Sequence, residues 1–423
     1  MNRIIILLFA TVVCACGAGS SESFGSASQA LSEPGYTSFV LHGGLFAGSV
    51  RYTSGNNAST IYMYGSQEDG ELGNGQNNGS FVTTPTNVFS RACPACIVQA
   101  VSGDNHSLVL TQAGNVYGWG DNSLGQLGLG STGSAPLPTF LRSGVASIVA
   151  GYKSSFIYVN GTGWMAAGQN GFGELGIGNS TSTVSTFTKM ALASTPGRYV
   201  LSAANDHLLI ADNSNNTVQC YGLNDTAQCC LPASNTPFVT SPHIIGQWGT
   251  LTGVYASANG VSYFTGTKAG VGGAQTGVWM CGDNALGQAG NGTIGGLITT
   301  PTMTFGASPL SNILSFSAGY TSTYIVVIGS DGNSHLYDTG DNISGQLGLG
   351  DHTARGSWTD VGVIGAGPAS GTAFKVIGNL SNQLAAYYWD FNANNGTIYA
   401  SGVPPFGNGT KYGDGVHFTA TNL

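Results

Sequence analysis

A glycine-rich segment that recurs seven times is the feature that most restricts how this chain can fold. One copy, residues 118–130, reads GWGDNSLGQLGLG. Related copies follow at intervals of about 56 residues and account for nearly all of the chain after residue 36. Repetition on this scale predicts one architecture built from similar units. Each copy holds one glycine on which the copies align: Gly65, Gly120, Gly168, Gly222, Gly282, Gly340 and Gly402.

Each unit contains several short strands. The stretch HSLVLTQAGNVYGWG, which ends at Gly120, is a pair of apolar runs joined by Ala-Gly-Asn, a turn suited to a tight hairpin. A polar stretch and a further run that contains proline follow the glycine loop, as in PLPTFL and TTPTNV. Only 7% of the 423 residues are charged and 67 are glycine, so helix formers are scarce. The pattern predicts an all-β chain whose units are the blades of a β-propeller.

The residues just before each anchor glycine are mostly aromatic. Both the first and the third position before it lie on one face of a strand, because side chains alternate along a strand. We expect this layer to pack against the neighbouring blade, and an apolar residue seven places after the anchor to be buried in the loop. The match of GLGSTG at 128–133 to a dinucleotide-binding pattern carries little weight, since no helix follows it. The position directly before the anchor glycine holds Tyr64, Trp119, Ala167, Tyr221, Cys281, Thr339 and Ser401. The position three residues before the anchor holds Tyr62, Tyr117, Met165, Gln219, Trp279, Tyr337 and Tyr399.

The segment GDNSLGQLGLG, with AVSGDNHSLVLT before it, resembles the repeat of the regulator of chromosome condensation family. The resemblance covers residues 37–423 and implies a seven-bladed β-propeller closed by strands from both termini, with 37–42 and 416–421 expected to complete one blade together. Copy four departs from the pattern, with Ala227 in place of a glycine and Cys229-Cys230 in place of Leu-Gly. The nucleotide-exchange role of the family's best-known member is not expected here, because the chain carries an export signal and lacks a basic chromatin arm. Similarity to a secreted propeller that inhibits β-lactamase implies protein binding by loops on one face.

The first residues predict export. MNRIIILLFATVVCACG has one arginine and an apolar run too short to span a membrane, which is typical of a secretion signal. VCAC resembles a bacterial lipobox cleaved before Cys16, so we expect residues 1–15 to be a signal peptide and Cys16 to be lipidated. A plain signal peptide cut nearby is the alternative. Residues 16–36 are small and polar, as a tether should be, and the absence of Asp after Cys16 favours the outer membrane or the cell surface.

Six cysteines remain after the signal and the lipidation site, an even number that indicates disulfides outside the cytoplasm. Cys93 and Cys96 lie between a polar loop and a strand. A local structural disulfide is expected there, because a catalytic pair normally sits at a helix N-terminus. We favour one bond from the Cys229-Cys230 loop to Cys220 or to Cys281. The four cysteines of units four and five allow three pairings: Cys220, Cys229, Cys230 and Cys281.

The remaining polar positions predict structure rather than chemistry. His106 and His207 occupy equivalent places in units two and four, which indicates hydrogen bonding within the fold. Asp121-Asn122 and its counterparts open the glycine loops, where their side chains can cap backbone N–H groups. Neither set has the spacing of a metal site, and no linear catalytic motif occurs. We therefore predict no catalytic residue, no metal and no cofactor.

A functional prediction follows from the repeat frame. The net charge is −8 and the 11 basic residues are scattered, which argues against nucleic-acid binding. We predict a monomeric, non-catalytic scaffold that binds an envelope or extracellular protein, or a glycan, through loops on one face. Its only membrane attachment would be the N-terminal lipid. The longer segments 134–144 and 249–274 are the expected binding loops.

Two alternatives remain open. An extracytoplasmic enzyme, a lyase or hydrolase, would place acids at the mouth of a central channel. The loop acids available for it are Glu68, Asp69, Glu71 and Glu174. Glu71 and Glu174 occupy the place of glutamine in other copies, so substitution within the repeat also explains them. A purely structural envelope component is the other alternative, and no residue separates it from the binding scaffold.

Overall fold

The computed structural model describes residues 37–42, 46–53, 58–91, 96–233, 237–270, 273–307, 309, 312–366, 374–377, 385–390, 397–402 and 419–421, and most side chains between 59 and 364. The expected signal peptide, Cys16, the tether and Cys93 lie outside these residues. Within them, no helix has the length and apolar character needed to cross a membrane.

Each repeat forms one antiparallel sheet of four strands that are consecutive in sequence, and seven such sheets occur in the described residues. Blades one and two contain β1 (Thr37–His42), β2 (Phe46–Thr53), β3 (Ala58–Ser66) and β4 (Phe81–Arg91), then β5 (Ile97–Ser102), β6 (His106–Thr111), β7 (Val116–Gly120) and β8 (Ala135–Arg142). Blades three and four contain β9 (Val145–Ala150), β10 (Ser154–Val159), β11 (Gly163–Gln169) and β12 (Thr183–Lys189), then β13 (Tyr199–Ala203), β14 (His207–Asp212), β15 (Thr217–Leu223) and β16 (Phe238–Gln247).

The other three blades follow the same order. Blade five contains β17 (Thr250–Ser257), β18 (Val261–Gly270), β19 (Gly273–Asp283) and β20 (Leu297–Gly306). Blade six contains β21 (Ile313–Ala318), β22 (Ser322–Ile328), β23 (Asn333–Gly340) and β24 (Arg355–Ala366). Blade seven contains β25 (Phe374–Ile377), β26 (Ala385–Asp390), β27 (Thr397–Gly402) and β28 (Thr419–Thr421).

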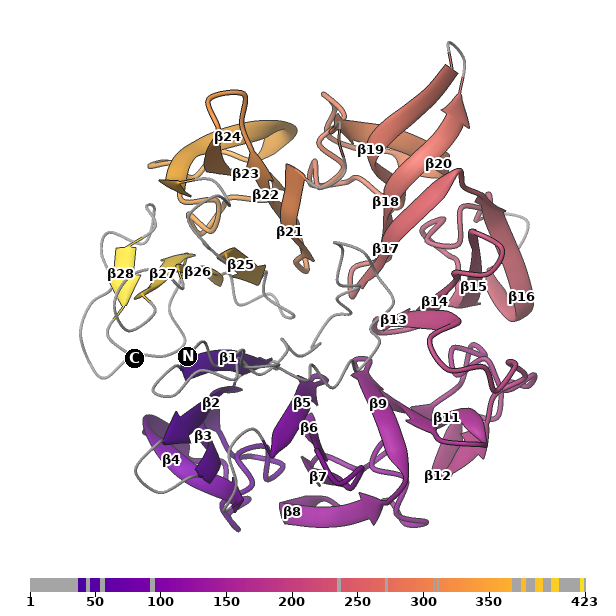
Figure 1. The fold of residues 1–423 in the computed structure, drawn as a ribbon, viewed down its shortest axis with the longest axis vertical. Coiled ribbons are helices and arrows are strands. Elements are labelled where there is room, and N and C mark those ends of the chain that lie inside the picture. The colour runs from indigo at the N-terminus through magenta and orange to yellow at the C-terminus, as the bar shows by residue number, and fades with distance from the viewer. Residues whose placement is uncertain are drawn as a thin grey trace, which may run out of the picture.

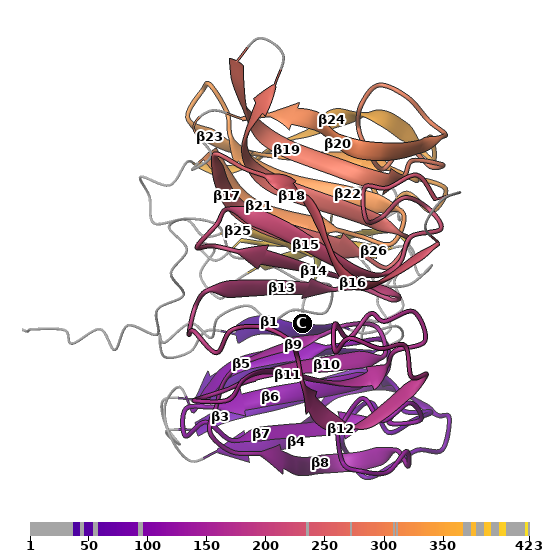
Figure 2. The same ribbon diagram turned by 90° about the vertical axis from the view of Figure 1, so that its right-hand side faces the viewer.

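The sheets are arranged as blades around a common centre (Figure 1). The first strand of each blade lies innermost and the fourth lies outermost, and innermost strands of neighbouring blades contact one another. Seen edge-on, the strands run from one face of the disc to the other (Figure 2). The prediction of a seven-bladed β-propeller is confirmed.

The two terminal strands belong to the first and the last blade, between which the ring closes. β1 pairs with β2 in the first blade, and β28 pairs with β27 in the last. These two blades are neighbours (Figure 1). The expectation that the termini complete one blade together is therefore wrong, because each terminal strand pairs within its own repeat.

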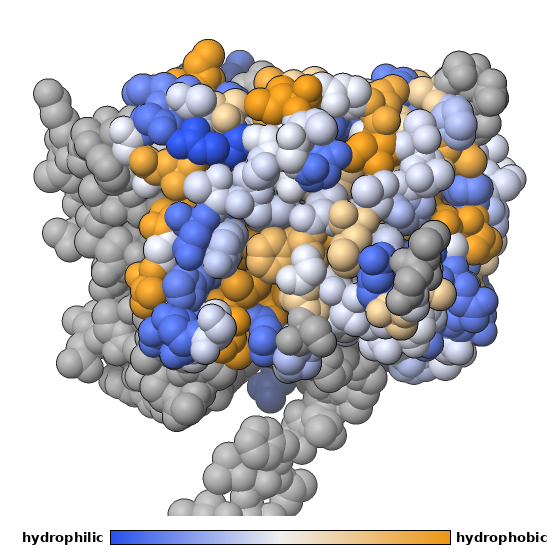
Figure 3. All heavy atoms as spheres, turned by 90° about the horizontal axis from the view of Figure 1, so that it is seen from above, coloured by the Kyte–Doolittle hydropathy of each residue, from blue (hydrophilic) through white to orange (hydrophobic). Residues whose placement is uncertain are grey.

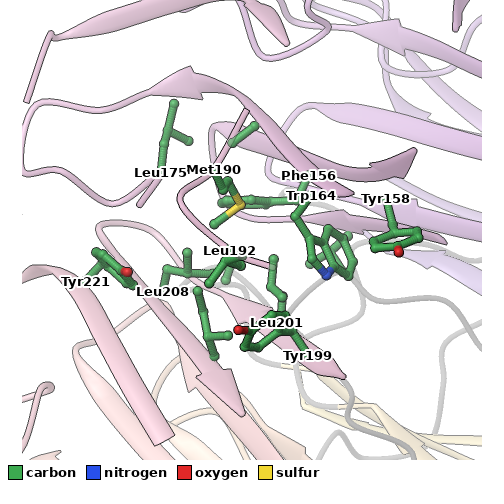
Figure 4. Close-up of a cluster of buried hydrophobic side chains, with 14 residues drawn as sticks. Phe156, Tyr158, Trp164, Leu175, Met190, Leu192, Tyr199, Leu201, Leu208 and Tyr221 are labelled. Atoms are coloured by element: carbon green, nitrogen blue, oxygen red, sulfur yellow. The ribbon is translucent and has the colours of Figure 1, made fainter. Parts of the chain in front are cut away.

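The hydrophobic core is divided among the seams between blades. Between blades three and four, Phe156, Trp164 and Leu175 pack with Leu208 and Tyr221 (Figure 4). Corresponding clusters join blades one and two, two and three, four and five, and five and six. An apolar blade face is thus removed from water only by its neighbour, so each blade depends on the next for stability.

The predicted aromatic layer lies in these seams and faces the preceding blade. Trp119 is fully buried, and its indole N–H donates to the carbonyl oxygen of Glu71 in the loop of blade one, 2.8 Å away. At the same position of blade six, the Thr339 hydroxyl donates to the carbonyl oxygen of Gly287 in the loop of blade five, also at 2.8 Å. The apolar residues seven places after the anchor are fully buried, as predicted: Leu72, Leu127, Leu175, Cys229, Ala289 and Leu347.

The glycine loops of blades one, two and five contact the outer strand of the following blade. The backbone N–H of Gly75 donates to the carbonyl oxygen of Pro136 at 2.8 Å, and that of Gly130 donates to Ser185 at 2.7 Å. The loop of blade five makes the same contact with blade six through Gly292. The recurring segment is therefore a clamp between neighbouring blades.

The anchor glycine has no room for a side chain. Gly120 has a φ of 97°, and a Cβ there would overlap the carbonyl oxygen of Asn105 and lie 2.9 Å from the Cα of His106. We expect Gly120→Ala to lower the free energy of unfolding by about 1–3 kcal/mol or more, because a strained backbone alone costs this amount. Gly133→Ala is the matched control, because no atom lies within 4 Å of that Cβ position. Denaturant unfolding of both variants checks this, and equal losses would contradict it.

The two segments expected to be binding loops are mostly strands. Segment 134–144 contains β8, and segment 249–274 contains β17, β18 and the start of β19. In blade five the extra residues lengthen a hairpin, in which the hydroxyls of Thr267 and Thr276 lie 2.9 Å apart across the strands. The interpretation as loops is wrong because the added threonine, valine and tyrosine residues favour strand pairing.

Candidate protein-binding face

The turns of the blades emerge on two faces of the disc. Turns between the first and second strands, and loops between the third and fourth, emerge on one face, which we call the loop face. Turns between the second and third strands, and the connections between blades, emerge on the other, which we call the hairpin face. Because equivalent turns of different blades emerge on the same side, residues far apart in sequence share each face.

Carboxyl and phenol groups converge near the centre of the loop face. Asp104 and Tyr152, from blades two and three, are hydrogen-bonded through their side chains. Burial raises the pKa of Asp104, while the bond from Tyr152 and the nearby Lys153 ammonium oppose that rise. Burial and the Asp104 carboxylate raise the pKa of Tyr152, and Tyr320 and Asp206 contribute to the rise. Groups from four blades therefore share one region.

Neutral amides contact the acids beside this group. The Asn105 amide donates to Asp69 at 3.2 Å, and the Gln169 amide donates to Asp206 at 2.7 Å. Burial raises the pKa of Asp206, and the nearby Asp225 carboxylate adds to the rise. The ion pairs formed by described residues lie elsewhere, at Asp212, Asp331, Asp351 and Asp360. The centre of the loop face thus carries negative charge that these pairs do not neutralise.

The Asp-Asn pair gives each glycine loop its shape. Asp121 Oδ1 accepts a hydrogen bond from the N–H of Ser123 at 2.8 Å, and Asp283 and Asp341 make the same cap at 3.0 and 3.1 Å. Asn122 accepts a bond from the N–H of Leu127 at 2.9 Å, so the loop closes around its buried leucine. The predicted capping role is confirmed.

Two of the four loop acids named for catalysis are internal to their loops. Glu71 and Glu174 are buried, and each accepts a hydrogen bond from the backbone N–H two residues earlier, at 2.8 Å. Gln126 makes the same bond at 3.0 Å, so glutamate and glutamine are interchangeable there. Burial raises the pKa of Glu174 to about 7. Asp69 joins the central group through Asn105, and Glu68 is exposed.

Comparison with known proteins identifies the repeat. The family model described as Regulator of chromosome condensation (RCC1) repeat matches residues 59–110 and 113–158, and a second model of that description matches 97–126. Residues 59–158 therefore carry RCC1 repeats. The human X-linked retinitis pigmentosa GTPase regulator is 46% identical to it over 79 residues, which are 19% of this chain. The match spans only 7% of the length of that relative.

Solved structures extend the RCC1-like fold over most of the chain. Human WBSCR16 matches with a TM-score of 0.60 and 18% identity, and the match covers 80% of this chain and 83% of that one. Yeast RCC1 (Prp20), solved bound to Kap60, matches with a TM-score of 0.60 and 16% identity, over 81% of this chain and 78% of that one. At these identities the likeness shows the propeller fold alone.

The fourth repeat replaces packing contacts with disulfides. Cys229 stands where most copies have leucine and is bonded to Cys220. Cys230 stands where most copies have glycine and is bonded to Cys281, the counterpart of Trp119. The second bond therefore joins the loop of blade four to β19 of blade five. Both expected partners are used, one by each cysteine, and Cys96 is also disulfide-bonded.

This loop keeps the backbone conformation of the second repeat without its glycines. Ala227 and Cys230 have φ values of 65° and 57°, close to the 77° and 65° of Gly125 and Gly128 in the second repeat. A left-handed conformation costs a residue with a side chain about 1–2 kcal/mol. The two disulfides connect this loop to β15 and to β19.

The two equivalent histidines are structural, as predicted. His106 Nε2 lies 3.0 Å from Ser155 Oγ, and His207 Nε2 lies 3.1 Å from Ser262 Oγ, in each case in the following blade. Burial lowers the pKa of His106 to about 4 and that of His207 to about 3. Both imidazoles are therefore neutral at pH 7.

These buried histidines predict sensitivity to acid. The ordinary pKa of histidine is 6.5, so below that pH the unfolded chain binds protons that the folded chain does not. Stability therefore decreases as the pH is lowered from 6.5 to the pKa of the folded state. We expect each histidine to remove roughly 3 kcal/mol of unfolding free energy by pH 4. Denaturant unfolding across this range measures the slope, and His106→Gln should reduce it. An unchanged slope in that variant would contradict the assignment.

The residues at the centre of the loop face were missed by the sequence analysis. Asp104, Tyr152 and Asp206 stand in the segments SGDNHS, AGYKSS and AANDHL, one or two residues before the second strand of their blades. That place lies near the ring centre, because the first strand of each blade is innermost. Comparing this turn across the copies is the signal that would have found them.

Proposed function

We propose that this chain is a non-catalytic docking platform that binds a partner protein through its loop face. The observation that carries the proposal is the clamping of the glycine loops between neighbouring blades, which holds the surface side chains in place. A preformed surface loses little conformational freedom when a partner binds, and loops on a rigid frame commonly carry recognition. For the structurally similar yeast protein Prp20p, binding to Gsp1p and histones has been characterised. That precedent supports protein binding by this fold.

We further propose that the platform works outside the cytoplasm, held at the cell surface or outer membrane by a lipid on Cys16. The Cys220–Cys229 and Cys230–Cys281 disulfides suit an oxidising compartment, and the lipobox-like VCAC supports lipidation. Cys16→Ser should move the chain from the membrane fraction to the soluble fraction and leave its disulfides intact. Membrane retention of that variant would contradict the anchor.

Capture by the full chain tests the docking role. The chain, tagged at its C-terminus and exported with its own leader, would be cross-linked in intact cells and purified from the envelope and the medium. We expect one protein at a near-equimolar ratio, recovered with both the native chain and Cys16→Ser. Retention by envelope polysaccharide without any protein would favour a glycan ligand instead. Recovery of neither would contradict the docking role.

A further inference from the structure

Exposed apolar side chains gather at the loop-face ends of the blades. Phe81, Phe238 and Leu297 begin the outer strands of blades one, four and five, where they pair with the loop-face ends of the third strands. Ile343 lies in the loop of blade six and is 71% exposed. Figure 3, which looks onto the outer side of blades five and six, shows apolar residues at the surface among hydrophilic ones. We define the apolar rim as Phe81, Leu129, Leu137, Phe238, Ile294, Leu297 and Ile343.

The hairpin side of the described residues carries fewer such groups. Only Phe140, Ile244 and Val363 are large, apolar and exposed there. Large exposed apolar groups that collect on one face mark interaction surfaces, because burying them is favourable. The rim therefore distinguishes the loop face from the hairpin face.

Charge is also divided between the two faces. Lys153 and Arg355 are the basic side chains described on the loop face, and Arg355 is paired with Asp351. Arg142, Lys189 and Lys268 stand at the hairpin ends of their strands. A cationic partner is thus attracted more strongly to the loop face than to the hairpin face. The described acids in the turns and loops of the loop face are Glu68, Asp69, Glu71, Asp104, Asp121, Glu174, Asp206, Asp225, Asp283, Asp341 and Asp351.

We propose that the loop face receives a partner segment in which lysine or arginine side chains stand beside apolar ones. The cations would lie over the acidic centre, and the apolar side chains would be buried against the rim. The inference rests on the proposed docking function and specifies its face and the chemistry of its partner. In the described part of the chain, the loop face is where acids that form no ion pair and exposed apolar side chains occur together.

The electrostatics of the centre favour such a partner. Asp104 and Asp206 are partly buried among other acids, and their pKa values are raised mainly by that burial. Ionised carboxyls in this environment are unfavourable, and a cation placed beside them stabilises the charged form. Binding should therefore strengthen as pH rises through the titration of these acids, and weaken with added salt.

A labelled synthetic peptide of alternating lysine and leucine is the probe, and fluorescence anisotropy measures its binding to the full chain carrying Cys16→Ser. Asp206→Asn/Asp225→Asn removes two negative charges from the loop face and should weaken binding about tenfold. Asp331→Asn/Asp360→Asn removes the same charge near the hairpin face and should change binding less than about twofold. Ile343→Ser should weaken binding several-fold, whereas Val363→Ser, an exposed residue of the same blade, should not.

Two results would overturn the inference. Equal weakening by the two double variants would mean that only the net charge of the chain attracts the peptide. Equal binding of a lysine-only peptide of the same length would mean that the rim takes no part. The capture experiment then separates the two proposals. If a partner is captured and its recovery is unaffected by Asp206→Asn/Asp225→Asn, the docking role stands and this inference is wrong. If the peptide binds as expected but no partner is captured, the docking role is wrong while the binding preference of the loop face stands.

Discussion

Trp119→Ala is expected to lower the free energy of unfolding by about 3–5 kcal/mol, as truncation of a fully buried aromatic residue does. The ring fills the seam between blades one and two, where it packs with Met63, Leu72 and Phe89. Its truncation also leaves the carbonyl oxygen of Glu71 without the indole N–H that donates to it at 2.8 Å. Denaturant unfolding followed by circular dichroism measures the loss.

Two further variants separate the contributions to this effect. Trp119→Phe keeps an aromatic ring in the seam but removes the N–H donor, so a loss of about 1–3 kcal/mol is expected from the unsatisfied carbonyl and the smaller ring. Phe238→Ala removes a ring that is 47% exposed and should cost much less. If Trp119→Ala were no more damaging than Phe238→Ala, the seam would not depend on this side chain.

The repeat made the blades predictable because it samples each contact several times. Trp119, Tyr221 and Thr339 occupy the same position of the repeat. It could therefore be predicted from the sequence that this face of the strand packs against the neighbouring blade. The buried leucines and the capping aspartates were predicted for the same reason. Each of these features depends on a few neighbouring residues whose spacing is conserved from copy to copy within the chain.

Features that depend on how the copies meet could not be read in this way. Strand pairing at the two termini depends on which neighbour each end reaches, and the repeat pattern does not contain that information. The group around Asp104 and Tyr152 assembles from turns of different blades, so no linear motif marks it. The pairing of Cys229 and Cys230 required the positions of Cys220 and Cys281 in two different sheets.

Removing the Cys230–Cys281 disulfide is expected to destabilise the chain more than removing Cys220–Cys229. The first closes a sequence separation of 51 residues and the second a separation of 9. In the chain-entropy account these loops correspond to about 4 and about 2.5 kcal/mol of unfolding free energy. The double variants Cys230→Ala/Cys281→Ala and Cys220→Ala/Cys229→Ala allow the comparison by denaturant unfolding. Equal losses would mean that seam packing, rather than covalent closure, decides stability there.

The backbone of the same loop supplies a second comparison. Cys230 has a φ of 57°, in the place where the second RCC1 repeat has Gly128. Cys230→Gly/Cys281→Ala should therefore be more stable than Cys230→Ala/Cys281→Ala by about 1 kcal/mol, because glycine adopts this conformation without strain. If the glycine variant is not the more stable of the two, the loop relaxes once the disulfide is gone. In that case the disulfide, and not the surrounding blades, imposes the RCC1 conformation on the fourth repeat.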